Sequence, residues 1–349
     1  MTTGWGFADF DDHEGVHLFT DPASGLRAVI AIHSTKLGPA AGGVRFWHYA
    51  DSDRAITDAL RLSRGMSFKN AMAGLPMGGG KGVVLAANPG DAITAAQLEA
   101  FGRAVESLGG RYVTAEDVGM SEASMKTIAT MTKHVSGLPV AAGSAGGDPG
   151  PSTSMGVYLG VKAAAQRGLG ASDMKGVHVA IQGVGSVGGG LARLLAQDGA
   201  RLTLADVNVD RARALAEELG AVTVAADAIL AIEADIISPN ALGAILTPDS
   251  IAALRTTVVA GGANNQLETT AEGSALQARG ILYAPDYVIN AGGIINVGLE
   301  YLGLGDRAEV EARIQRIPER LVEVWDESDR TGAPASDVAD SIARRLIGR

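Results

Sequence analysis

The apolar residues in the second half of the chain fall into short continuous runs separated by segments of helical spacing. The runs, each typical of a buried strand, occupy residues 177–182, 201–206, 235–238, 257–261 and 281–285. Between the first three runs, amphipathic segments indicate helices over 186–198 and 209–219. Because strands that alternate with helices pair side by side in parallel, this pattern predicts a doubly wound parallel sheet.

The first 140 residues follow a less regular pattern. Continuous apolar runs at 26–33, 82–86 and 112–115 indicate strands, and helical spacing indicates a helix over 53–74. Gly-rich turns follow the first strand and this helix. We therefore expect a mixed sheet with helices here, distinct from the second half.

The segment GSAGGDPGP, residues 143–151, has too many Gly and Pro to continue a helix or a strand and predicts a linker. The chain also exceeds the roughly 250 to 300 residues at which one core usually stops growing. We expect one domain over 1–142 and a second over 143–329, with a cleft between them. Apolar spacing predicts one long helix over 307–329 that returns to the first domain, and a last helix over 330–349 that packs back on it.

Composition and charge narrow the possible functions. A formal charge of −10 and a pI near 5.1 would repel a phosphate backbone, which excludes nucleic acid as a partner. The absence of cysteine excludes disulfides and thiol chemistry and fits a reducing compartment. The chain starts without the apolar stretch of a signal peptide and has no run long enough for a membrane helix. We therefore expect a soluble cytoplasmic protein. The six histidines have no metal-binding spacing, so we expect no metal.

A dinucleotide motif opens the second domain. Gly183, Gly185 and Gly188 form GxGxxG directly after the strand that ends at Gln182. Glycines at these positions allow a tight turn, close approach of a pyrophosphate and close packing of helix on strand. Among 47 glycines the motif alone could be a packing turn. Its place between strand and helix, followed by Asp206 at the end of the next strand, predicts a Rossmann domain.

Asp206 also bears on the choice of cofactor. A carboxylate at this position binds the ribose 2′-hydroxyl of NAD and repels the 2′-phosphate of NADP, and no arginine immediately follows it. We therefore expect NAD. The alternative is that Asp206 caps the helix that begins near Asn208.

Two lysines lie in the segment RGMSFKNAMAGLPMGGGKGVV, residues 64–84. Either lysine alone would be interpreted as a solvated charge. Here Lys69 lies among apolar residues on the helix, and Lys81 follows three glycines that leave no side chains around it. Burial and a second cation nearby both lower the pKa of a lysine towards neutrality, as a general base requires.

The chain resembles the glutamate/leucine/phenylalanine/valine dehydrogenase family, most closely its leucine-specific members. The matching segments run through nearly the whole chain in the family's order: GPAAGGVRF (38–46), FKNAMAGLPMGGGKG (68–82), YVTAEDVG (112–119), QGVGSVG (182–188), GGANNQL (261–267) and YAPDYVINAGGIINV (283–297). The resemblance implies an N-terminal mixed-sheet domain for substrate binding and oligomerisation, a Rossmann NAD-binding domain, and an active site in the cleft between them. It also implies a homo-oligomer.

The resemblance assigns roles to individual residues. Lys69 would bind the substrate carboxylate, Lys81 would activate the water that attacks an imine, and Asp117 would assist proton transfer. Asn264 would hold the nicotinamide end of NAD, and Asn290 would reach the substrate or the nearby ribose. For both asparagines the alternative is a loop or cap hydrogen bond.

Further positions complete the two sites. The cofactor site would include Ser186, Val187, Thr153 and Asn240. The substrate pocket would include Ala41, Gly42, Ala115, Ile294 and Val297. These pocket residues are small or apolar, so a charged substrate side chain would be left unpaired.

The pocket residues point to an apolar substrate. Glutamate-specific members resemble the chain too, but they carry a lysine where this chain has Ala41, so glutamate should be a poor substrate. Ala115 resembles the leucine type, whereas Ala41 is smaller than that type's usual residue and leaves room for a larger side chain. We expect oxidative deamination of leucine, valine or isoleucine to the 2-oxo acid and ammonia, with phenylalanine as the alternative.

Two other classes of protein share parts of this pattern. A Rossmann methyltransferase would use the glycine-rich turn but would not need Lys69, Lys81 and Asp117. An inactive regulatory homologue could retain the dinucleotide fold. The intact lysines favour the enzyme.

Overall fold

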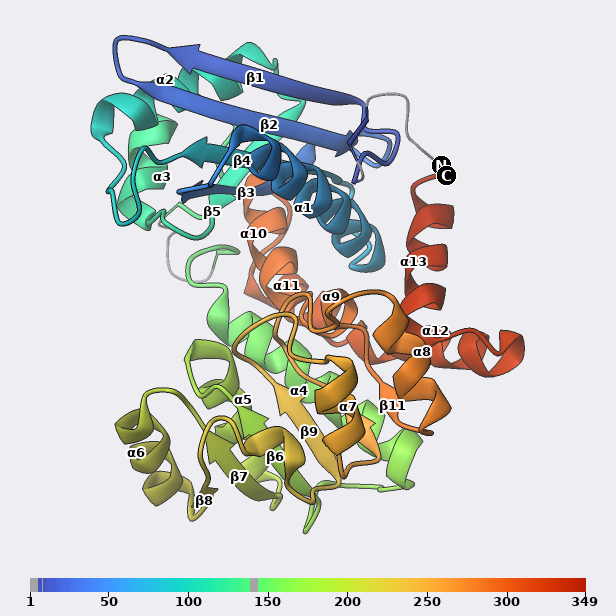
Figure 1. Cartoon of the computed structure of the whole chain (residues 1–349). Helices are drawn as coiled ribbons and strands as arrows, with labels where there is room; N and C mark the ends of the chain where they lie inside the picture. Colours follow the sequence, from blue (N-terminus) through green and yellow to red (C-terminus); the bar gives the residue numbers. More distant parts are fainter. Residues whose placement is uncertain (1–5, 8, 139–143) are drawn as a thin grey trace. The chain divides into compact units, whose positions relative to one another are not determined.

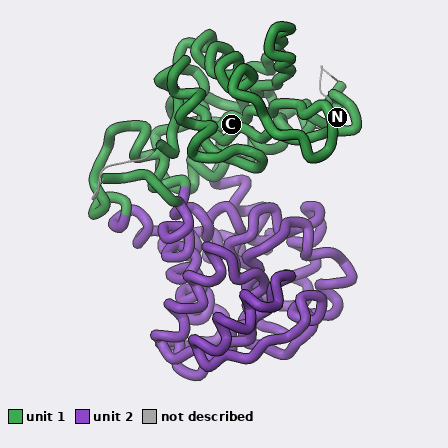
Figure 2. Tube along the Cα trace, turned by 90° about the vertical axis from the view of Figure 1, so that its left-hand side faces the viewer, with its two compact units in different colours: residues 1–148, 294–310, 343–349 green, residues 149–293, 311–342 purple. Residues whose placement is uncertain are grey.

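The computed structural model describes residues 6–7, 9–138 and 144–349 and divides into two compact units (Figure 2). Unit 1 comprises Met1–Asp148, Ile294–Val310 and Ala343–Arg349, and unit 2 comprises Pro149–Gly293 and Glu311–Ile342. Unit 1 thus contains two segments that lie far along the chain from its first 148 residues.

Unit 1 is built on a five-stranded mixed sheet with the order β1-β2-β4-β3-β5 (Figure 1). The strands are β1 (Gly15–Asp21), β2 (Leu26–Ser34), β3 (Ala40–Trp47), β4 (Gly78–Leu85) and β5 (Tyr112–Glu116). β2 pairs antiparallel with β1 and β4, whereas β3 pairs parallel with β4 and β5. The mixed sheet predicted from the sequence is confirmed.

Helices cover both faces of this sheet, which explains why β2 is apolar at nearly every position. α1 (Ser52–Met72) packs on one face, where Val29 lies in a core cluster with Leu60. α2 (Ala95–Ser107) and α3 (Glu122–Ala129) pack on the other, where Ile30 lies with Phe101. Strand side chains alternate between the two faces of the sheet, so a strand that is buried on both faces has one continuous run of apolar residues.

The start of β4 corrects the sequence analysis. That analysis placed Lys81 in a loop and began the strand at residue 82, but β4 begins at Gly78 and Lys81 lies within it. The glycines are strand residues because α1 approaches closely. A Cβ on Gly79 would lie 2.0 Å from the backbone nitrogen of Ser67 on α1.

Unit 2 is a six-stranded parallel sheet with the order β11-β10-β9-β6-β7-β8. Its strands are β6 (His178–Gln182), β7 (Arg201–Ala205), β8 (Val222–Thr223), β9 (Ile236–Pro239), β10 (Val258–Val259) and β11 (Leu282–Tyr283). In this sheet β6 is central and the strand order reverses beside it, as in a doubly wound dinucleotide-binding fold. The predicted Rossmann-type sheet is confirmed.

The helices of unit 2 connect these strands. They are α4 (Gly150–Leu169), α5 (Ser186–Gln197), α6 (Val209–Leu219), the 3₁₀ turn η1 (Ile229–Ala231), α7 (Pro248–Ala253), α8 (Ala271–Ala278) and α9 (Asp286–Ile289). The expected linker over 143–151 is shorter than predicted, since α4 begins at Gly150. Pro151 lies in the first turn of α4, where its missing N–H costs no hydrogen bond.

The single long helix predicted over 307–329 is wrong. The structure has α11 (Arg307–Ile314) and α12 (Ile317–Thr331), separated by residues 315 and 316. Pro318 causes the break, because a proline ring clashes with the carbonyl four residues earlier and supplies no N–H. α12 packs against α4 and α9 within unit 2, so it does not return to the first domain as expected.

Two later segments belong to unit 1. α10 (Gly292–Leu302) contributes residues from Ile294 on, whereas the sequence analysis gave them to the second domain. A Cβ on Gly298 would lie 3.1 Å from the Leu75 side chain, which shows how closely α10 approaches residues 75–77. α13 (Ala335–Leu346) contributes only its end, from Ala343.

The chain end is bound to the start of unit 1. Arg344 forms an ion pair with Asp11 at 2.8 Å. Arg349 donates hydrogen bonds to the backbone oxygens of Asp11, Asp12 and His33. Of the helices in the described part of the chain, none has both the length and the apolar character needed to cross a membrane.

Candidate active site

Lys81 lies in the middle of β4, and Asp117 directly follows the end of β5 in unit 1. β3 lies between β4 and β5 and pairs with both, so the end of β5 lies near the middle of β4. Lys81 is 5% exposed, and its Nζ donates a hydrogen bond to Oδ2 of Asp117. The structure therefore brings together the two residues that the sequence analysis assigned to proton transfer.

The surroundings of this pair lower the pKa of both Lys81 and Asp117, each for a different reason. Burial lowers the pKa of Lys81 below its usual range, although the carboxylate of Asp117 opposes the shift. Burial would raise the pKa of Asp117, but the charges of Lys81 and Arg45 outweigh it and hold that pKa below its usual range. A lysine that loses its proton readily beside an ionised carboxylate can accept a proton and pass it on.

The second cation near Lys81 is Arg45 on β3, a residue that the sequence analysis did not single out. Its Nε donates to Oδ2 of Asp117 at 3.1 Å, and its Nη1 donates to Oδ2 of Asp58 at 2.8 Å. A signal was available in the segment GPAAGGVRF, because Arg45 is four residues from Ala41 and shares its face of a strand. The sequence analysis predicted no strand there, so this alternation was not used.

The predicted substrate residues lie on several elements of unit 1. Ala41 and Gly42 are buried on β3, and Ala115 is half-buried on β5, where it pairs with Gly43. Lys69 is half-buried in the last turn of α1. A Cβ on Gly43 would lie 2.9 Å from Cβ of Asp117, so glycine at this position lets Asp117 approach the backbone of β3 closely.

Ile294 and Val297 are half-buried on the part of α10 that belongs to unit 1. Asn296, between them, fixes this helix by accepting from Gly146 N at 2.8 Å and donating to Gly146 O at 2.9 Å. The close approach of Gly298 to Leu75 and Met77 places the middle of α10 beside residues 75–77, which connect α1 to β4. Helix α10 and the strand of Lys81 are therefore parts of one unit.

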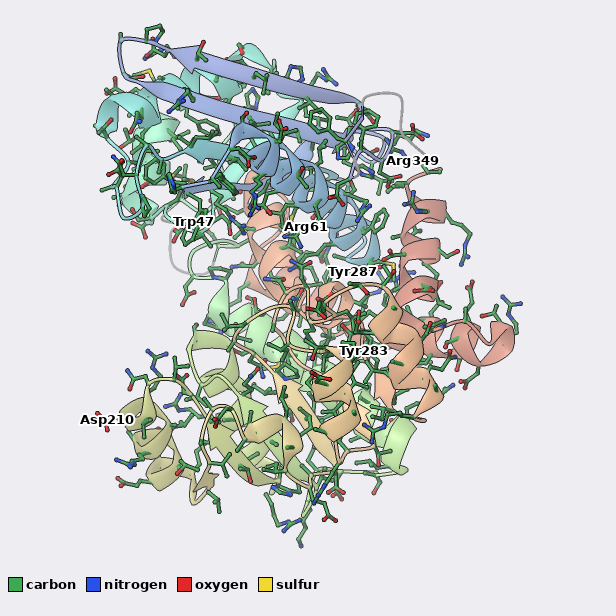
Figure 3. All side chains as sticks on the ribbon, in the orientation of Figure 1. Trp47, Arg61, Asp210, Tyr283, Tyr287 and Arg349 are labelled. Atoms are coloured by element: carbon green, nitrogen blue, oxygen red, sulfur yellow. The ribbon has the colours of Figure 1, made fainter. Side chains whose placement is uncertain are left out.

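Beyond Arg45, the same end of the sheet carries a hollow of about 470 Å³. Its walls include Arg45, Trp47, Tyr49, Asp58 and Arg61. Figure 3 labels two of them, Trp47 at the end of β3 and Arg61 on α1. The hollow is open, and Arg45 in its wall donates a hydrogen bond to Asp117.

The glycine-rich turn in unit 2 has the form that a dinucleotide requires. Gly183 has a φ of +82°, and a Cβ on Gly188 would lie 1.9 Å from the oxygen of Gly183. At Gly185 the nearest atom to a built Cβ is Nη1 of Arg211, 3.7 Å away. No side chain caps α5, whose first residues are Ser186 and Val187, so its first N–H groups are available to a phosphate.

Asp206 lies beside this turn and not at a helix cap. It accepts hydrogen bonds from Val184 N at 2.9 Å and Asn208 N at 2.8 Å. Asn208 is itself the N-cap of α6, so the alternative that Asp206 caps this helix is wrong. The structure also shows a cation that the sequence analysis did not identify. Nη1 of Arg211 lies 3.8 Å from Oδ2 of Asp206.

The predicted asparagines converge on Gly262. Asn240 accepts from Gly262 N at 2.9 Å, and Asn290 donates to Gly262 O at 3.1 Å and to Oδ1 of Asn264 at 2.8 Å. Oδ1 of Asn290 is buried without a hydrogen-bond partner in the protein. A buried acceptor of this kind awaits a donor, and a bound ligand supplies one.

Thr153 lies in the first turn of α4. Its hydroxyl donates to Pro149 O at 2.8 Å, and a Cβ on Gly293 would lie 2.5 Å from its oxygen. Taken together, the uncapped start of α5, the bare Gly185 and the unpaired oxygen of Asn290 fit NAD. Of this set, the turn glycines and Asp206 would hold the pyrophosphate and the ribose.

Comparisons with known proteins agree with this geometry. A family model described as "Glu/Leu/Phe/Val dehydrogenase, dimerisation domain" matches residues 13–134. A second, "Glutamate/Leucine/Phenylalanine/Valine dehydrogenase", matches residues 203–343. Together the two models cover most of the chain.

Individual relatives match over almost their whole length. The leucine dehydrogenase of Thermoactinomyces intermedius is 45% identical over 336 residues, which is 96% of this chain and 91% of the relative. The valine dehydrogenase of Streptomyces coelicolor is 44% identical over 343 residues, 97% of this chain and 93% of the relative. The crystal structure of L-tryptophan dehydrogenase from Nostoc punctiforme superposes with a TM-score of 0.85 at 38% identity and covers 96% of each chain.

These matches extend through both units and include the segments that carry Lys81, Asp117 and Asp206. The family acts on the CH–NH₂ group of amino acids with a nicotinamide cofactor, which agrees with a lysine poised for proton transfer and a Rossmann-type sheet. The chain is therefore a member of the glutamate/leucine/phenylalanine/valine dehydrogenase family, an NAD(P)-dependent L-amino-acid dehydrogenase.

Proposed function

We propose that this enzyme catalyses the NAD-dependent, reversible oxidative deamination of leucine, valine or isoleucine. The amino acid, water and NAD⁺ would give the 2-oxo acid, ammonium, NADH and a proton. The observation that carries the proposal is the buried Lys81, hydrogen-bonded to the ionised Asp117. The similarity to leucine and valine dehydrogenases supports the choice of branched-chain substrates.

The residues of this chain supply binding and proton transfer. Bound NAD would provide the acceptor for the hydride that leaves the substrate Cα. Neutral Lys81 accepts the proton of the water that attacks the imine carbon, and Asp117 holds the charged lysine in place. Lys69 binds the substrate carboxylate with a fixed positive charge. Asn290 offers its unpaired Oδ1 to the substrate or the nearby ribose, and Asn264 holds the nicotinamide end.

The choice of NAD rests on Asp206. Its side chain is almost fully buried beside the glycine-rich turn, and two backbone N–H groups hold it there. A fixed carboxylate at this point binds a ribose 2′-hydroxyl and repels a 2′-phosphate. The other residues we assign to the cofactor are Gly183, Gly185, Ser186, Val187, Gly188, Thr153 and Asn240.

The substrate preference rests on an apolar pocket. Ala41, Ala115, Ile294 and Val297 offer a substrate side chain no charge and no hydrogen bond. A γ-carboxylate would lose its water there without gaining a partner, which costs several kcal/mol. Glutamate should therefore be a poor substrate. Phenylalanine is the alternative, because Ala41 is small, and the tryptophan-acting relative shares the fold.

Absorbance at 340 nm with NAD and a panel of L-amino acids tests the proposal. We expect turnover with leucine, valine and isoleucine and little with glutamate. Lys81→Ala should remove turnover by a factor of about 10² or more while NADH binding, measured by fluorescence titration, stays intact. Lys126→Ala is the matched control, because Lys126 is an exposed lysine of unit 1 paired with Glu122.

Two outcomes would contradict the proposal. Near-normal turnover of the Lys81→Ala variant would show that another group is the base. NADH binding without turnover of any amino acid would favour the inactive regulatory homologue. We also propose that the enzyme is a homo-oligomer, as its match to a dimerisation domain suggests, and light scattering tests this separately.

A further inference from the structure

A chain of alternating charges extends outward from the catalytic pair. Lys81 contacts Asp117, Asp117 contacts Arg45, and Arg45 contacts Asp58. Each of the inner charges thus has a neighbour of opposite sign on both sides. These residues come from β4, the end of β5, β3 and α1, so four separate elements of unit 1 meet along this chain.

The outer end of the chain is fixed by Asp58. Its Oδ2 accepts from the Tyr49 hydroxyl at 2.6 Å as well as from Arg45, and its Oδ1 accepts from Arg61 at 3.2 Å. The Asp58 side chain is 12% exposed. Burial would raise the pKa of Asp58, but the Tyr49 hydrogen bond and the charge of Arg45 outweigh it and keep the pKa below its usual range. Asp58 is therefore a fixed, ionised anchor for Arg45.

The inner end of the chain sets the orientation of Asp117. Nε of Arg45 and Nζ of Lys81 both donate to the same oxygen, Oδ2, and they approach it from neighbouring strands. A carboxylate held through one oxygen by two cations cannot rotate without breaking both contacts. Charge-assisted hydrogen bonds of this kind are about twice as strong as neutral ones.

We propose that Arg45 is a positioning residue for the Lys81–Asp117 pair and that Asp58 holds Arg45 in place for this purpose. The inference rests on the proposed role of Lys81 as the general base. Arg45 orients Asp117, keeps it ionised, and places a second positive charge near Lys81. Without that charge, the carboxylate alone would stabilise the protonated lysine, which cannot act as a base.

Because Arg45 and Asp58 carry opposite charges, removing one or the other should shift the pKa of Lys81 in opposite directions. The positive charge of Arg45 lowers the pKa of Lys81, whereas the negative charge of Asp58 raises it. Two further ionisable groups act here: the carboxylate of Asp117 raises the pKa of Lys81, and burial together with the charge of Asp117 raises the pKa of Tyr112 on β5. They remain unchanged in both variants, so the two substitutions isolate the outer charges.

The experiment measures kcat/KM against pH for the wild-type enzyme and for Arg45→Gln, Arg45→Lys and Asp58→Asn. Activity should fall on the acid side as Lys81 becomes protonated. In Arg45→Gln this acid limb should move to higher pH by on the order of one unit. In Asp58→Asn it should move to lower pH by a smaller amount, since Asp58 is farther away. Arg45→Lys keeps the charge and should leave the limb near its wild-type position.

We expect kcat of Arg45→Gln to fall by about 10- to 100-fold through loss of orientation, with partial rescue in Arg45→Lys. A merely structural role would lower stability or activity without moving the acid limb. Acid limbs that stay fixed, or that move in the same direction in Arg45→Gln and Asp58→Asn, would overturn the inference. If Arg45→Gln does not fold, the direction of the shift in Asp58→Asn decides.

The result also separates this inference from the proposed function. A wild-type profile that is flat on the acid side, with an active Lys81→Ala variant, would refute the role of Lys81. An acid limb in the wild type that neither variant moves would refute only the role of Arg45 and Asp58.

Discussion

Asp206 links cofactor preference to the local structure of the glycine-rich turn. The same carboxylate that we expect to bind the ribose is held by the N–H groups of Val184 and Asn208. Arg211 lies 3.8 Å from it, on the first turn of α6. In the wild-type protein we expect the negative charge of Asp206 to outweigh this arginine at the 2′ position, because the carboxylate is almost fully buried beside the turn.

Replacing Asp206 by Ser should therefore release Arg211 to bind a 2′-phosphate. We expect the dissociation constant for NADPH to fall by about 10-fold or more and that for NADH to rise, as measured by fluorescence titration. The double variant Asp206→Ser with Arg211→Ala is the control and should lose the gain in NADPH affinity. If wild-type enzyme binds NADPH as well as NADH, the argument from Asp206 is wrong.

At the scale of single residues, the sequence analysis singled out Lys81 and Asp117, which the structure brings into contact, but not Arg45 and Asp58 beside them. The glycines and apolar residues around Lys81 suggested a base, and the family resemblance implied the role of Asp117. Arg45 and Asp58 come close to Asp117 only through the pairing of β3 with β5 and through the packing of α1, and neither relation is encoded by local spacing. Arg211 was also overlooked, because it lies five residues after Asp206 and approaches it only in the folded chain.

Among the elements, β4 and α1 pack closely against each other. A Cβ on Gly79 would lie 2.0 Å from Ser67 N and 2.5 Å from Ser63 O, both backbone atoms of α1. Backbone cannot move aside as a flexible side chain does. The helix and the strand that carry Lys69 and Lys81 are therefore held at a separation that only glycine permits.

Gly79→Ala should therefore destabilise the enzyme by about 2 kcal/mol or more, because α1 must shift away from the strand. Urea unfolding measures the loss. Gly65→Ala is the matched control: Gly65 lies exposed within α1 with no atom within 4 Å of a built Cβ, so alanine should stabilise the helix by about 0.5 to 1 kcal/mol. Equal effects of the two substitutions would show that the close approach of α1 is not what requires glycine at position 79.

The elements that the sequence predicted are those with strong apolar periodicity. The central strands β6 and β7 and the helices α5 and α6 agree with their predicted ranges within one residue at each end. β3 was missed because its first four residues, Ala-Ala-Gly-Gly, have little β-propensity and form a strand only between β4 and β5. The break at Pro318 was missed because apolar spacing continues across it.

At the scale of the whole molecule, a buried polar cluster ties the chain end to unit 1. His13 is buried and hydrogen-bonds Leu60 O and Ser63 Oγ at 3.0 Å. Its ring lies edge-on to that of His33, which contacts Ser67, Asp11 and Arg349. Burial, and then the charge of His33, lower the pKa of His13 to about 4.

This shift makes the stability of the enzyme depend on pH. A histidine whose pKa is lower in the folded than in the unfolded protein stabilises the fold fully above about pH 6.5, and this contribution is lost as the pH falls towards 4. We expect a loss on the order of 2 kcal/mol between pH 7 and pH 4.5, measured by denaturant unfolding.

His13→Gln cannot titrate and should show a smaller loss over the same range. The matched control is His48→Gln, a half-buried histidine at the end of β3. If the wild type and His13→Gln lose stability in parallel between these pH values, acid destabilisation arises elsewhere in the molecule.

The division of unit 1 into three stretches of chain has a consequence for its synthesis. During translation, residues 1–148 emerge from the ribosome long before residues 294–310 and 343–349, which belong to the same unit. Contacts of Asp11 and His33 with Arg344 and Arg349 can form only after translation has passed the last of these residues. Residues 1–148 therefore lack these contacts while nearly all of unit 2 is synthesised. We expect chaperones to bind them mainly during this interval.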